Sequence, residues 1–414
     1  MPAQNLTIDP QKLWDAIMET AKFGATAKGG IKRLTLSDDD KMVRDWFKAA
    51  CEALGCKVSV DSVGNMFAVR PGKRADLLPI ALGSHLDTQP TGGKFDGVLG
   101  VLGALEALRT LVATGYETNA PLMLVNWTNE EGSRFAPAML CSGVYAGVFT
   151  PDFAYSREDR DGKKLGDELA RIGYRGAEPV GSHKFQALFE LHIEQGPILE
   201  AERKEVGVVT GVQGMRWYEV TVRGQEAHTG ATPMKLRKNA LLGAARMIEA
   251  IDKVGMDHLP GVASVGLIEN RPNSRNVVPG EVFFTVDLRH PDEGVLDKME
   301  SAFRKALPVC AAGQNLEFDE KRIWNSPVVK FHADLIDCVR TGATKAGYTT
   351  REMASGAGHD AAYIARVAPT TMIFVPCLGG LSHNEAESTT LEECGHGSQV
   401  LLNAVLEYDR RLSA

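Results

Sequence analysis

The sequence predicts an α/β protein with a central mixed sheet flanked by helices, interrupted by a smaller inserted domain. Three observations support this fold class. At 414 residues, the chain exceeds the size at which a single hydrophobic core stops growing. Apolar runs of strand length alternate with helical periodicity in residues 1–211 and again in residues 330–414, which is typical of one layered α/β domain. Residues 212–329 instead alternate polar and apolar positions, as half-exposed strands do.

In the first part of the main domain, the apolar spacing places the elements. Ser37 and the three aspartates that follow it suit the first turn of a helix, where anionic side chains are stabilising. Residues 134–184 are irregular apart from short helical pieces. The expected helices are 8–27, 37–54, 97–113, 143–147 and 165–172, and the expected strands are 58–60, 65–69, 77–82, 120–127 and 185–191.

The inserted domain, residues 212–329, reads in the order β-α-β-β-α-β, which is the split βαβ sandwich. Its edge strands could pair across a two-fold axis, so we expect a homodimer formed through this domain, which would also act as a lid over the active site. Its expected elements are 217–222, 239–254, 262–269, 282–289, 294–307 and 316–324; a helix at 331–346, a strand at 370–375 and a helix at 390–411 follow in the second part of the main domain.

Composition excludes several classes of partner. A net charge of −7 and a pI near 5.9 argue against nucleic acid or an anionic membrane as the main partner. The longest apolar stretch, residues 98–113, contains two charged residues and is too short to span a bilayer. The seven cysteines are scattered without a Cys-x-x-Cys pair, and residues 1–5 lack the features of a secretory signal. We therefore expect a cytoplasmic protein without a thiolate metal site.

Four predicted strands are each followed by side chains that could bind a metal ion. Open α/β sheets bind ligands at the carboxyl ends of their strands, so these side chains should converge on one crevice. Imidazole and carboxylate ligands without cysteine suit a pair of Zn²⁺, Mn²⁺ or Co²⁺ ions. The candidate side chains are those of His85 with Asp96, Glu130 with Glu131, His192, and His383.

Each of these signals has a structural alternative when it is taken alone. A single histidine after a strand is more often structural than a ligand, and Glu130-Glu131 could be a solvated turn. Asp87, two residues after His85, could accept a hydrogen bond from the His85 ring and orient it. Because all four groups of candidate ligands follow predicted strands, binding of metal ions is favoured over these structural alternatives.

The residues around these positions resemble the M20 metallopeptidase/amidohydrolase superfamily, and within it the hydantoinase/carbamoylase branch. That branch contains N-carbamoyl-L-amino-acid hydrolases, β-ureidopropionases and allantoate amidohydrolases. The matching blocks run through almost the whole chain. They are residues 83–87, 93–97, 129–135, 190–197, 224–234, 272–279, 355–361 and 381–387.

The resemblance implies a role for each candidate ligand. Asp96 would bridge two divalent metal ions; His85 and His192 would complete one site, and Glu131 and His383 the other. Glu130 would be the general base that takes a proton from the attacking water, which is consistent with a carboxylate placed beside a ligand but not used as one.

The resemblance also implies substrate contacts. His228 would polarise the scissile carbonyl and would be supplied by the partner subunit of the dimer, while Asn276 and Arg289 would hold the substrate carboxylate. Gln195 and the loop around Gly358 would complete the pocket, although His359 beside it could be structural. Without the resemblance, His228 reads as a loop histidine and Arg289 as a partner in a surface salt bridge.

The expected activity is hydrolysis of the N-carbamoyl group of an N-carbamoyl-amino acid to the amino acid, ammonia and carbon dioxide. Three alternatives remain open: an allantoate amidohydrolase, a more distant dipeptidase or aminoacylase, and a non-catalytic binding module. Residues 211–217 and 235–238 look more like carbamoylases than allantoate amidohydrolases. A binding module would not need Glu130 beside Glu131.

Overall fold

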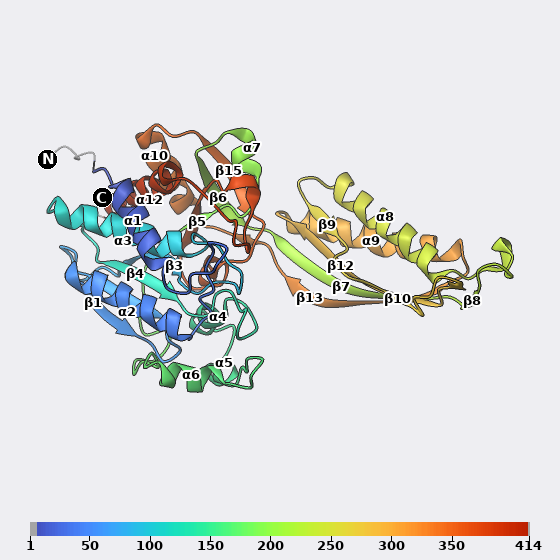
Figure 1. Ribbon diagram of the computed structural model, residues 1–414. Coiled ribbons are helices and arrows are strands. Elements are labelled where there is room, and N and C mark those ends of the chain that lie inside the picture. Colours follow the sequence, from blue (N-terminus) through green and yellow to red (C-terminus); the bar gives the residue numbers. More distant parts are fainter. Residues whose placement is uncertain (1–5, 413–414) are drawn as a thin grey trace. The chain divides into compact units, whose positions relative to one another are not determined.

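The computed structural model describes residues 6–412, and its packing divides the chain into two compact units (Figure 1). The main unit comprises residues up to Gly211 and from Lys330 onward, and the inserted unit is Val212–Val329. Residues 1–5, considered above for a secretory signal, lie outside the described part. Within residues 6–412, no helix has the length and apolar character needed to cross a bilayer.

The main unit is built on a nine-stranded mixed sheet, which confirms the expected α/β class. The sheet order is β1-β2-β4-β3-β5-β16-β6-β14, and β15 pairs with β6. At its centre β4, β3, β5 and β16 are mutually parallel neighbours. The strands are β1 Lys57–Val60, β2 Met66–Arg70, β3 Ile80–His85, β4 Leu122–Trp127, β5 Ala187–Ile193, β6 Val206–Val212, β14 Val329–Lys330, β15 Thr350–Ser355 and β16 Thr370–Val375.

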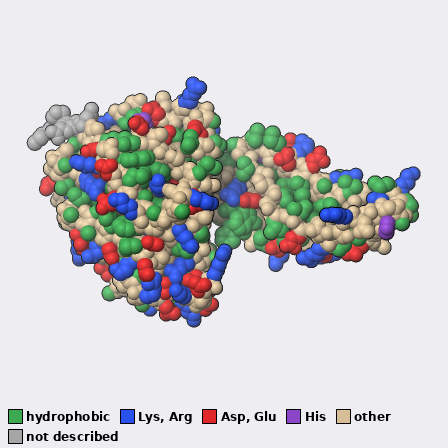
Figure 2. All heavy atoms as spheres, viewed as in Figure 1, with side chains coloured by type: hydrophobic (Ala, Val, Ile, Leu, Met, Phe, Trp, Pro, Cys, Tyr) green, Lys and Arg blue, Asp and Glu red, His purple; other side chains and the backbone are tan. Residues whose placement is uncertain are grey.

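Helices pack against this sheet. The helix α3 is buried on nearly all sides, because it contacts β3, β5, α1 and α12. Figure 2 shows acidic and basic side chains interspersed on the visible face of the main unit. The helices are α1 Pro10–Thr20, α2 Asp38–Ala53, α3 Val98–Ala113, α4 Leu140–Tyr145, α5 Pro151–Tyr155, α6 Leu165–Arg171, α7 Ile198–Glu202, α10 Ala333–Ala346, α11 Asp360–Ile364 and α12 Leu391–Arg411, with a short 3₁₀ turn at Leu378–Gly380. Another 3₁₀ turn, Met234–Leu236, belongs to the inserted unit.

Several boundaries in the main unit differ from the sequence-based expectation. The first helix ends at Thr20 rather than residue 27, and the chain turns through Gly24, whose φ of +85° is incompatible with helix. The strand expected at 77–82 runs instead from Ile80 to His85, and the strand expected at 185–191 runs from Ala187 to Ile193. His85 and His192 therefore lie within the strands, where ladder hydrogen bonds fix their main chains opposite Trp127 and Phe374.

In the inserted unit, five strands form one sheet in the order β10-β12-β7-β13, with β9 also paired to β12. The helices α8 and α9 pack on one face of it. The single strand expected at 262–269 is two short strands, separated by a break that contains Gly266. The elements are β7 Gly214–Arg223, β8 Ala227–His228, α8 Ala240–Asp257, β9 Val262–Ser264, β10 Ile268–Arg271, β11 Val277–Val278, β12 Glu281–His290, α9 Glu293–Ala312 and β13 Glu317–Ser326.

The sheet of the inserted unit is long in the strand direction. β7 and β12 pair over ten residues, from Gly214↔His290 to Arg223↔Glu281. Arg289 pairs with Met215 near one end, whereas the small β8-β11 ladder, in which His228 pairs with Val277, follows the other end. The eight residue-to-residue steps from Met215 to Arg223 span about 26 Å at a strand rise of about 3.3 Å per residue.

Candidate metal centre

The predicted ligands gather at one edge of the main sheet. β4, β3, β5 and β16 run parallel, so their carboxyl ends share that edge. Glu130 and Glu131 follow β4, His85 ends β3, His192 lies near the end of β5, and His383 lies in the loop after β16.

Asp96 lies between two groups of ligand atoms. Its Oδ1 is 3.5 Å from Nε2 of His85 and 3.1 Å from Nε2 of His192. Its Oδ2 is 3.5 Å from Nε2 of His383, which in turn is 3.3 Å from Oε2 of Glu131. Each group, His85-Asp96-His192 and Asp96-Glu131-His383, offers ligand atoms that all lie within 4.8 Å of one another. The arrangement is that of a carboxylate able to bridge two ions.

The two strand histidines present the same nitrogen to this centre. Nδ1 of His85 lies 2.9 Å from the main-chain oxygen of Asp87, and Nδ1 of His192 lies 2.9 Å from that of Ile193. Because a carbonyl only accepts, each Nδ1 carries a proton, so Nε2 is the nitrogen that each ring turns toward the centre. In His192 this nitrogen also lies 3.2 Å from the main-chain N–H of Gly97. Beside them Gly97 has a φ of +66°, and a Cβ there would lie 2.3 Å from the His85 ring.

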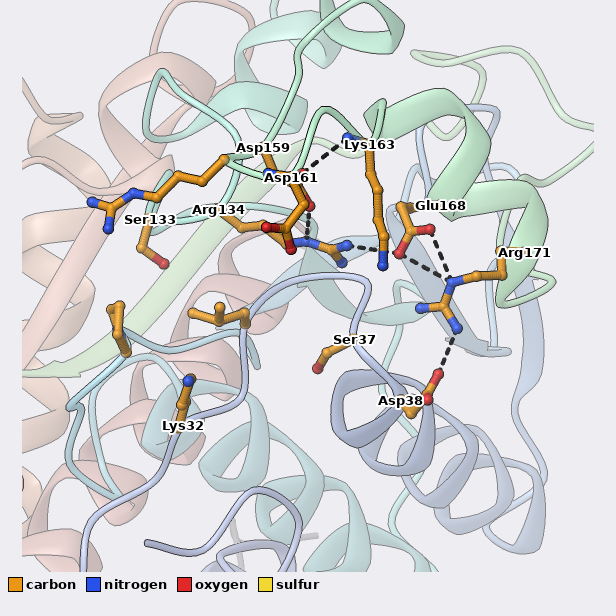
Figure 3. A pocket seen from close by; sticks show the side chains of 13 residues that line it. Lys32, Ser37, Asp38, Ser133, Arg134, Asp159, Asp161, Lys163, Glu168 and Arg171 are labelled. Carbon is orange, nitrogen blue, oxygen red and sulfur yellow. Dashed lines mark hydrogen bonds and ion pairs between the residues drawn. The ribbon is translucent and has the colours of Figure 1, made fainter.

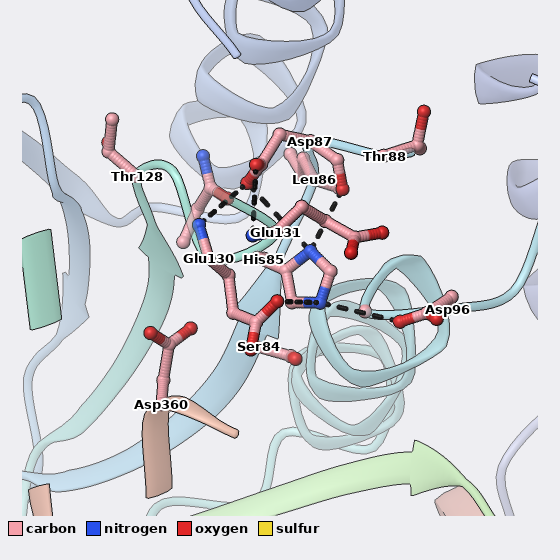
Figure 4. Close-up of polar contacts among 12 residues, drawn as sticks. Ser84, His85, Leu86, Asp87, Thr88, Asp96, Thr128, Glu130, Glu131 and Asp360 are labelled. Carbon is pink, nitrogen blue, oxygen red and sulfur yellow. Dashed lines mark hydrogen bonds and ion pairs between the residues drawn. The ribbon is translucent and has the colours of Figure 1, made fainter. Parts of the chain in front are cut away.

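Asp87 holds the His85 ring as expected, and it does so through its main-chain oxygen, which accepts from Nδ1 at 2.9 Å. Its carboxylate is 3.8 Å from that nitrogen. That carboxylate instead accepts from the main-chain N–H groups of Glu130 at 3.2 Å and Glu131 at 3.3 Å. Asp87 therefore fixes the turn that carries both glutamates (Figure 4).

The side chains of Glu130 and Glu131 point in different directions. Oε2 of Glu130 lies 3.5 Å from Nε2 of His85, on the side that also faces Asp360 (Figure 4). Oε2 of Glu131 lies near His383 and accepts from Nε2 of Gln89 at 2.6 Å. Burial raises the pKa of both carboxyls well above the usual range, and neighbouring carboxylates raise it further.

These residues fit divalent metal ions. Burial alone would raise the pKa of Asp96, but the hydrogen bonds and charges of His192 and His85 outweigh it and lower that pKa well below its usual range. The carboxyl groups of Asp87, Asp96, Glu130 and Glu131 are all buried in this region. Bound cations would stabilise the ionised form of these carboxyls, and the oxygen and imidazole donors are those that Zn²⁺, Mn²⁺ or Co²⁺ accept.

Gln195 and Gly358 come to the same region of the main unit. Nε2 of Gln195 donates to Oδ2 of Asp96 at 2.8 Å, and its Oε1 is buried without a hydrogen-bond partner. Gly358 precedes His359, whose ring packs edge-on against His192 with centroids 4.6 Å apart. Nε2 of His359 is 2.9 Å from Oγ of Ser355, and burial lowers its pKa well below the usual range, which fits the structural alternative.

His228, Asn276 and Arg289 belong to the inserted unit, and the structure brings together only two of them. Thr229 donates through its main-chain N–H to the oxygen of Asn276, so Asn276 lies beside the His228 strand. Nε and Nη2 of Arg289 pair with the carboxylate of Asp287, with Nη2 at 2.7 Å from Oδ2. The salt bridge considered as the alternative for Arg289 is therefore present.

Three buried carboxyls around the centre received no individual role from the sequence. Oε1 of Glu190 accepts from Ser84, and the Asp360 carboxylate accepts from Ser142 while its Oδ2 has no partner. Glu387 accepts from the Asp96 loop. All three lie in the matching blocks above, but hydrogen bonds between segments so far apart in the chain leave no periodic signal.

A polar hollow of about 570 Å³ on the main unit is distinct from the ligand groups (Figure 3). Arg134, at its wall, donates to Asp159 at 3.0 Å and to Glu168 at 2.7 Å, and Arg171 also pairs with Glu168. Nη1 of Arg134 donates to the main-chain oxygen of Thr35. These pairs anchor the chain three residues after Glu131.

Comparison with known proteins agrees with this geometry. The sequence profile of Peptidase family M20/M25/M40 matches residues 81–407. An N-carbamoyl-L-amino-acid amidohydrolase of Rhizobium meliloti is 52% identical over 98% of both chains, and one of Paenarthrobacter aurescens is 35% identical over 97% of this chain and 98% of its own. An allantoate amidohydrolase of Bacillus subtilis is 33% identical over 97% and 98%.

The solved structures agree as well. An amidase of the hydantoinase/carbamoylase family from Burkholderia multivorans is 54% identical and superposes with a TM-score of 0.95 over 97% of this chain and 98% of its own. The ligand groups, the sheet that carries them and these similarities lead to one conclusion. The chain belongs to Peptidase family M20/M25/M40 and, within it, to the hydantoinase/carbamoylase branch.

Proposed function

We propose that this protein is an amidohydrolase that removes the N-carbamoyl group of N-carbamoyl-L-amino acids, releasing the amino acid, ammonia and carbon dioxide. The observation that carries this proposal is the 52% identity, over nearly the whole chain, to the Rhizobium meliloti enzyme of that name. The donor groups around Asp96 support a hydrolytic reaction assisted by two divalent ions.

His85, Asp96 and His192 would hold one ion, and Asp96, Glu131 and His383 the other. When bound, such ions lower the pKa of a water molecule and polarise the carbonyl under attack. Glu130 belongs to neither group, yet its main chain is fixed beside Glu131. Its carboxylate is thus free to take the proton from the attacking water and pass it to the leaving nitrogen.

Arg289 is the proposed clamp for the substrate carboxylate. Its planar guanidinium already binds a carboxylate through two nitrogens, that of Asp287. A substrate carboxylate would share or replace this partner, with the same fork geometry. Gln195 and Gly358 would line the pocket from the main unit.

The geometry of the inserted unit supports a dimer in which His228 and Arg289 of one chain serve different active sites. Arg289 pairs with Met215, whereas the His228 strand begins beyond Arg223, about 26 Å away along the sheet. An N-carbamoyl-amino acid is much shorter than this. If both residues contact substrate, one of them must come from the partner subunit. Because Asn276 lies beside His228, it would accompany His228 in trans.

An ammonia-release screen tests the proposed substrate. N-Carbamoyl-L-amino acids, N-carbamoyl-β-alanine, allantoate and a dipeptide should be compared with Mn²⁺, Zn²⁺ or Co²⁺ present. The proposal expects the highest kcat/KM for an N-carbamoyl-L-amino acid and loss of turnover after chelation. A preference for allantoate would instead favour the alternative that the Bacillus subtilis relative represents. Full activity of a protein free of metal by elemental analysis would contradict the metal proposal.

A further inference from the structure

Glu387 connects the Asp96 loop to the His383 loop, two of the segments that carry candidate metal ligands. It lies in the segment between β16 and α12, four residues after His383, and it is buried. Its Oε1 accepts hydrogen bonds from the main-chain N–H groups of Phe95 at 3.0 Å and Asp96 at 3.1 Å. One carboxylate oxygen therefore holds the main chain of the residue that would bridge the two ions.

The second oxygen of Glu387 reaches the other side of the centre. Oγ of Ser382 lies 3.1 Å from Oε2 of Glu387 and 2.9 Å from Oδ2 of Asp96. A hydroxyl has one proton, so Ser382 donates to one carboxylate at a time. Ser382 directly precedes His383, whose φ is +54° and whose side chain is 52% exposed. With so little packing around the ring, its direction depends on the main chain that Ser382 and Glu387 hold.

The space for Glu387 is provided by the Asp96 loop itself. A Cβ at residue 93 would lie 2.1 Å from Oε1 of Glu387, so Gly93 is needed for this approach. Glu387 also donates its main-chain N–H to the oxygen of Asn384 at 3.0 Å, closing the turn that follows His383. Oε1 of Glu387 thus accepts from two N–H groups, Oε2 lies within hydrogen-bond distance of Ser382, and Glu387 belongs to neither ligand group.

We propose that Glu387 is a positioning residue that joins the Asp96 loop to the His383 loop, so that the affinities of both metal positions depend on it. The inference rests on the proposed two-ion site. Outer residues that orient metal ligands commonly change metal affinity about 10- to 100-fold when they are replaced. Loss of Glu387 releases Asp96, which is common to both groups, and therefore should weaken both positions together.

The test compares metal binding of the full-length protein with that of three variants. Glu387→Ala removes both hydrogen-bonding oxygens, Glu387→Gln keeps an acceptor for the two N–H groups, and Ser382→Ala removes only the hydroxyl link. Glu392→Ala, at an exposed glutamate in the first turn of α12, is the matched control. Dissociation constants for Mn²⁺ and Zn²⁺ come from competition with a chelator, and circular dichroism and thermal unfolding report on the fold.

For Glu387→Ala, both dissociation constants should rise by about 10- to 100-fold, with smaller rises for Glu387→Gln and Ser382→Ala and none for Glu392→Ala. At saturating metal, kcat should return to near that of the wild type, because Glu387 does not touch substrate. Unchanged affinities in a folded Glu387→Ala, or a loss confined to one ion, would overturn the inference. If Glu387→Ala does not fold, the other two variants decide, and unchanged affinity in both would overturn it. A wild type that binds no divalent ion would refute the proposed function itself.

Discussion

The carboxylate of Asp87 accepts the main-chain N–H of Glu130 at 3.2 Å through Oδ1. Its other oxygen accepts the N–H of the next residue, Glu131, so that one side chain fixes the starting point of both glutamates. From this fixed turn, the Glu130 side chain extends toward His85 and the Glu131 side chain toward His383. Two adjacent glutamates can therefore have different roles.

Glu130 and Glu131 should separate in their effects on turnover and on metal content. Glu130→Gln should keep both ions and lower kcat by roughly 10²- to 10⁴-fold, the usual contribution of a general acid–base. Glu131→Gln should lower the occupancy of one ion, because its oxygen belongs to a ligand group. Elemental analysis beside steady-state kinetics distinguishes the two. An empty metal position in Glu130→Gln, with full turnover after reloading, would reverse the assignment.

Inactive variants should complement each other according to their place in the inserted unit. Arg289 lies near one end of the five-stranded sheet, and His228 lies in the separate β8-β11 ladder beyond its other end. In the proposed dimer, a mixed pair of His228→Ala and Arg289→Ala chains should therefore contain one intact site and one doubly defective site. Random subunit exchange makes about half of the dimers mixed, and about a quarter of wild-type activity should return.

The matched control for this experiment is His228→Ala mixed with Asn276→Ala. These residues lie side by side and would serve the same site, so each site of a mixed dimer keeps one defect and no activity should return. Native mass spectrometry verifies exchange. Silence in the first mixture would show that His228 and Arg289 serve the same site and would contradict the proposed arrangement. Recovery in the control would show that Asn276 does not serve the same site as His228.

The buried pair of Asp40 and Arg44 should matter for stability. Oδ2 of Asp40 accepts from Nε of Arg44 at 2.8 Å, and Arg44 also donates to Thr128, which precedes the turn of Glu130. Asp40→Asn should lower the free energy of unfolding by about 3–5 kcal/mol, because it leaves a buried guanidinium uncompensated. Urea unfolding measures this.

The control is Glu52→Gln in the exposed Lys48–Glu52 pair on the same helix, where a loss of about 0–1 kcal/mol is expected. Equal losses at the buried and the exposed pair would show that burial does not set the cost.

Glu168 should make stability depend on pH. Burial alone would raise its pKa, but hydrogen bonds and charges of Arg134 and Arg171 outweigh it and hold the pKa below the ordinary value of 4.5. The stabilisation is thus fully present above the pKa of the unfolded chain and is lost as pH falls through the lower native pKa. The difference in unfolding free energy between wild type and Glu168→Gln should be positive at about pH 6 and shrink toward about pH 3. A difference that does not vary with pH would contradict this.

The sequence could predict the ligand edge because strand-end reasoning needs only local information. An apolar run, a histidine at its end and a parallel neighbour place His85 and His192, and four groups of candidate ligands at strand ends indicate one edge of the sheet. The same reasoning could not find the contact between Glu387 and Asp96, which joins residues 291 positions apart. Nor could it show that the Asp87 oxygen on the His85 ring is the main-chain one, since both oxygens belong to one residue.

Periodicity also missed short or interrupted strands. Residues 262–269 have the alternation of one strand, yet β9 and β10 pair with separate parts of β12 on either side of Gly266. β15 pairs with β6 outside the main strand order, and its sequence is partly polar, so its hydrophobic pattern is weak. Backbone breaks and partner choice are set by tertiary packing, which alternation along the chain does not record.

The length of the inserted sheet has a consequence for how the protein responds to dilution. Arg289 pairs with Met215, the sheet runs about 26 Å from there to Arg223, and the His228 ladder follows beyond that end. Under the proposed trans arrangement, a lone subunit would therefore lack the His228 contact to its substrate even with every metal ligand in place. Specific activity should therefore fall as the enzyme is diluted below the dissociation constant of the dimer, and should recover on concentration. In a cell, enzyme activity would then rise more than in proportion to the concentration of the protein.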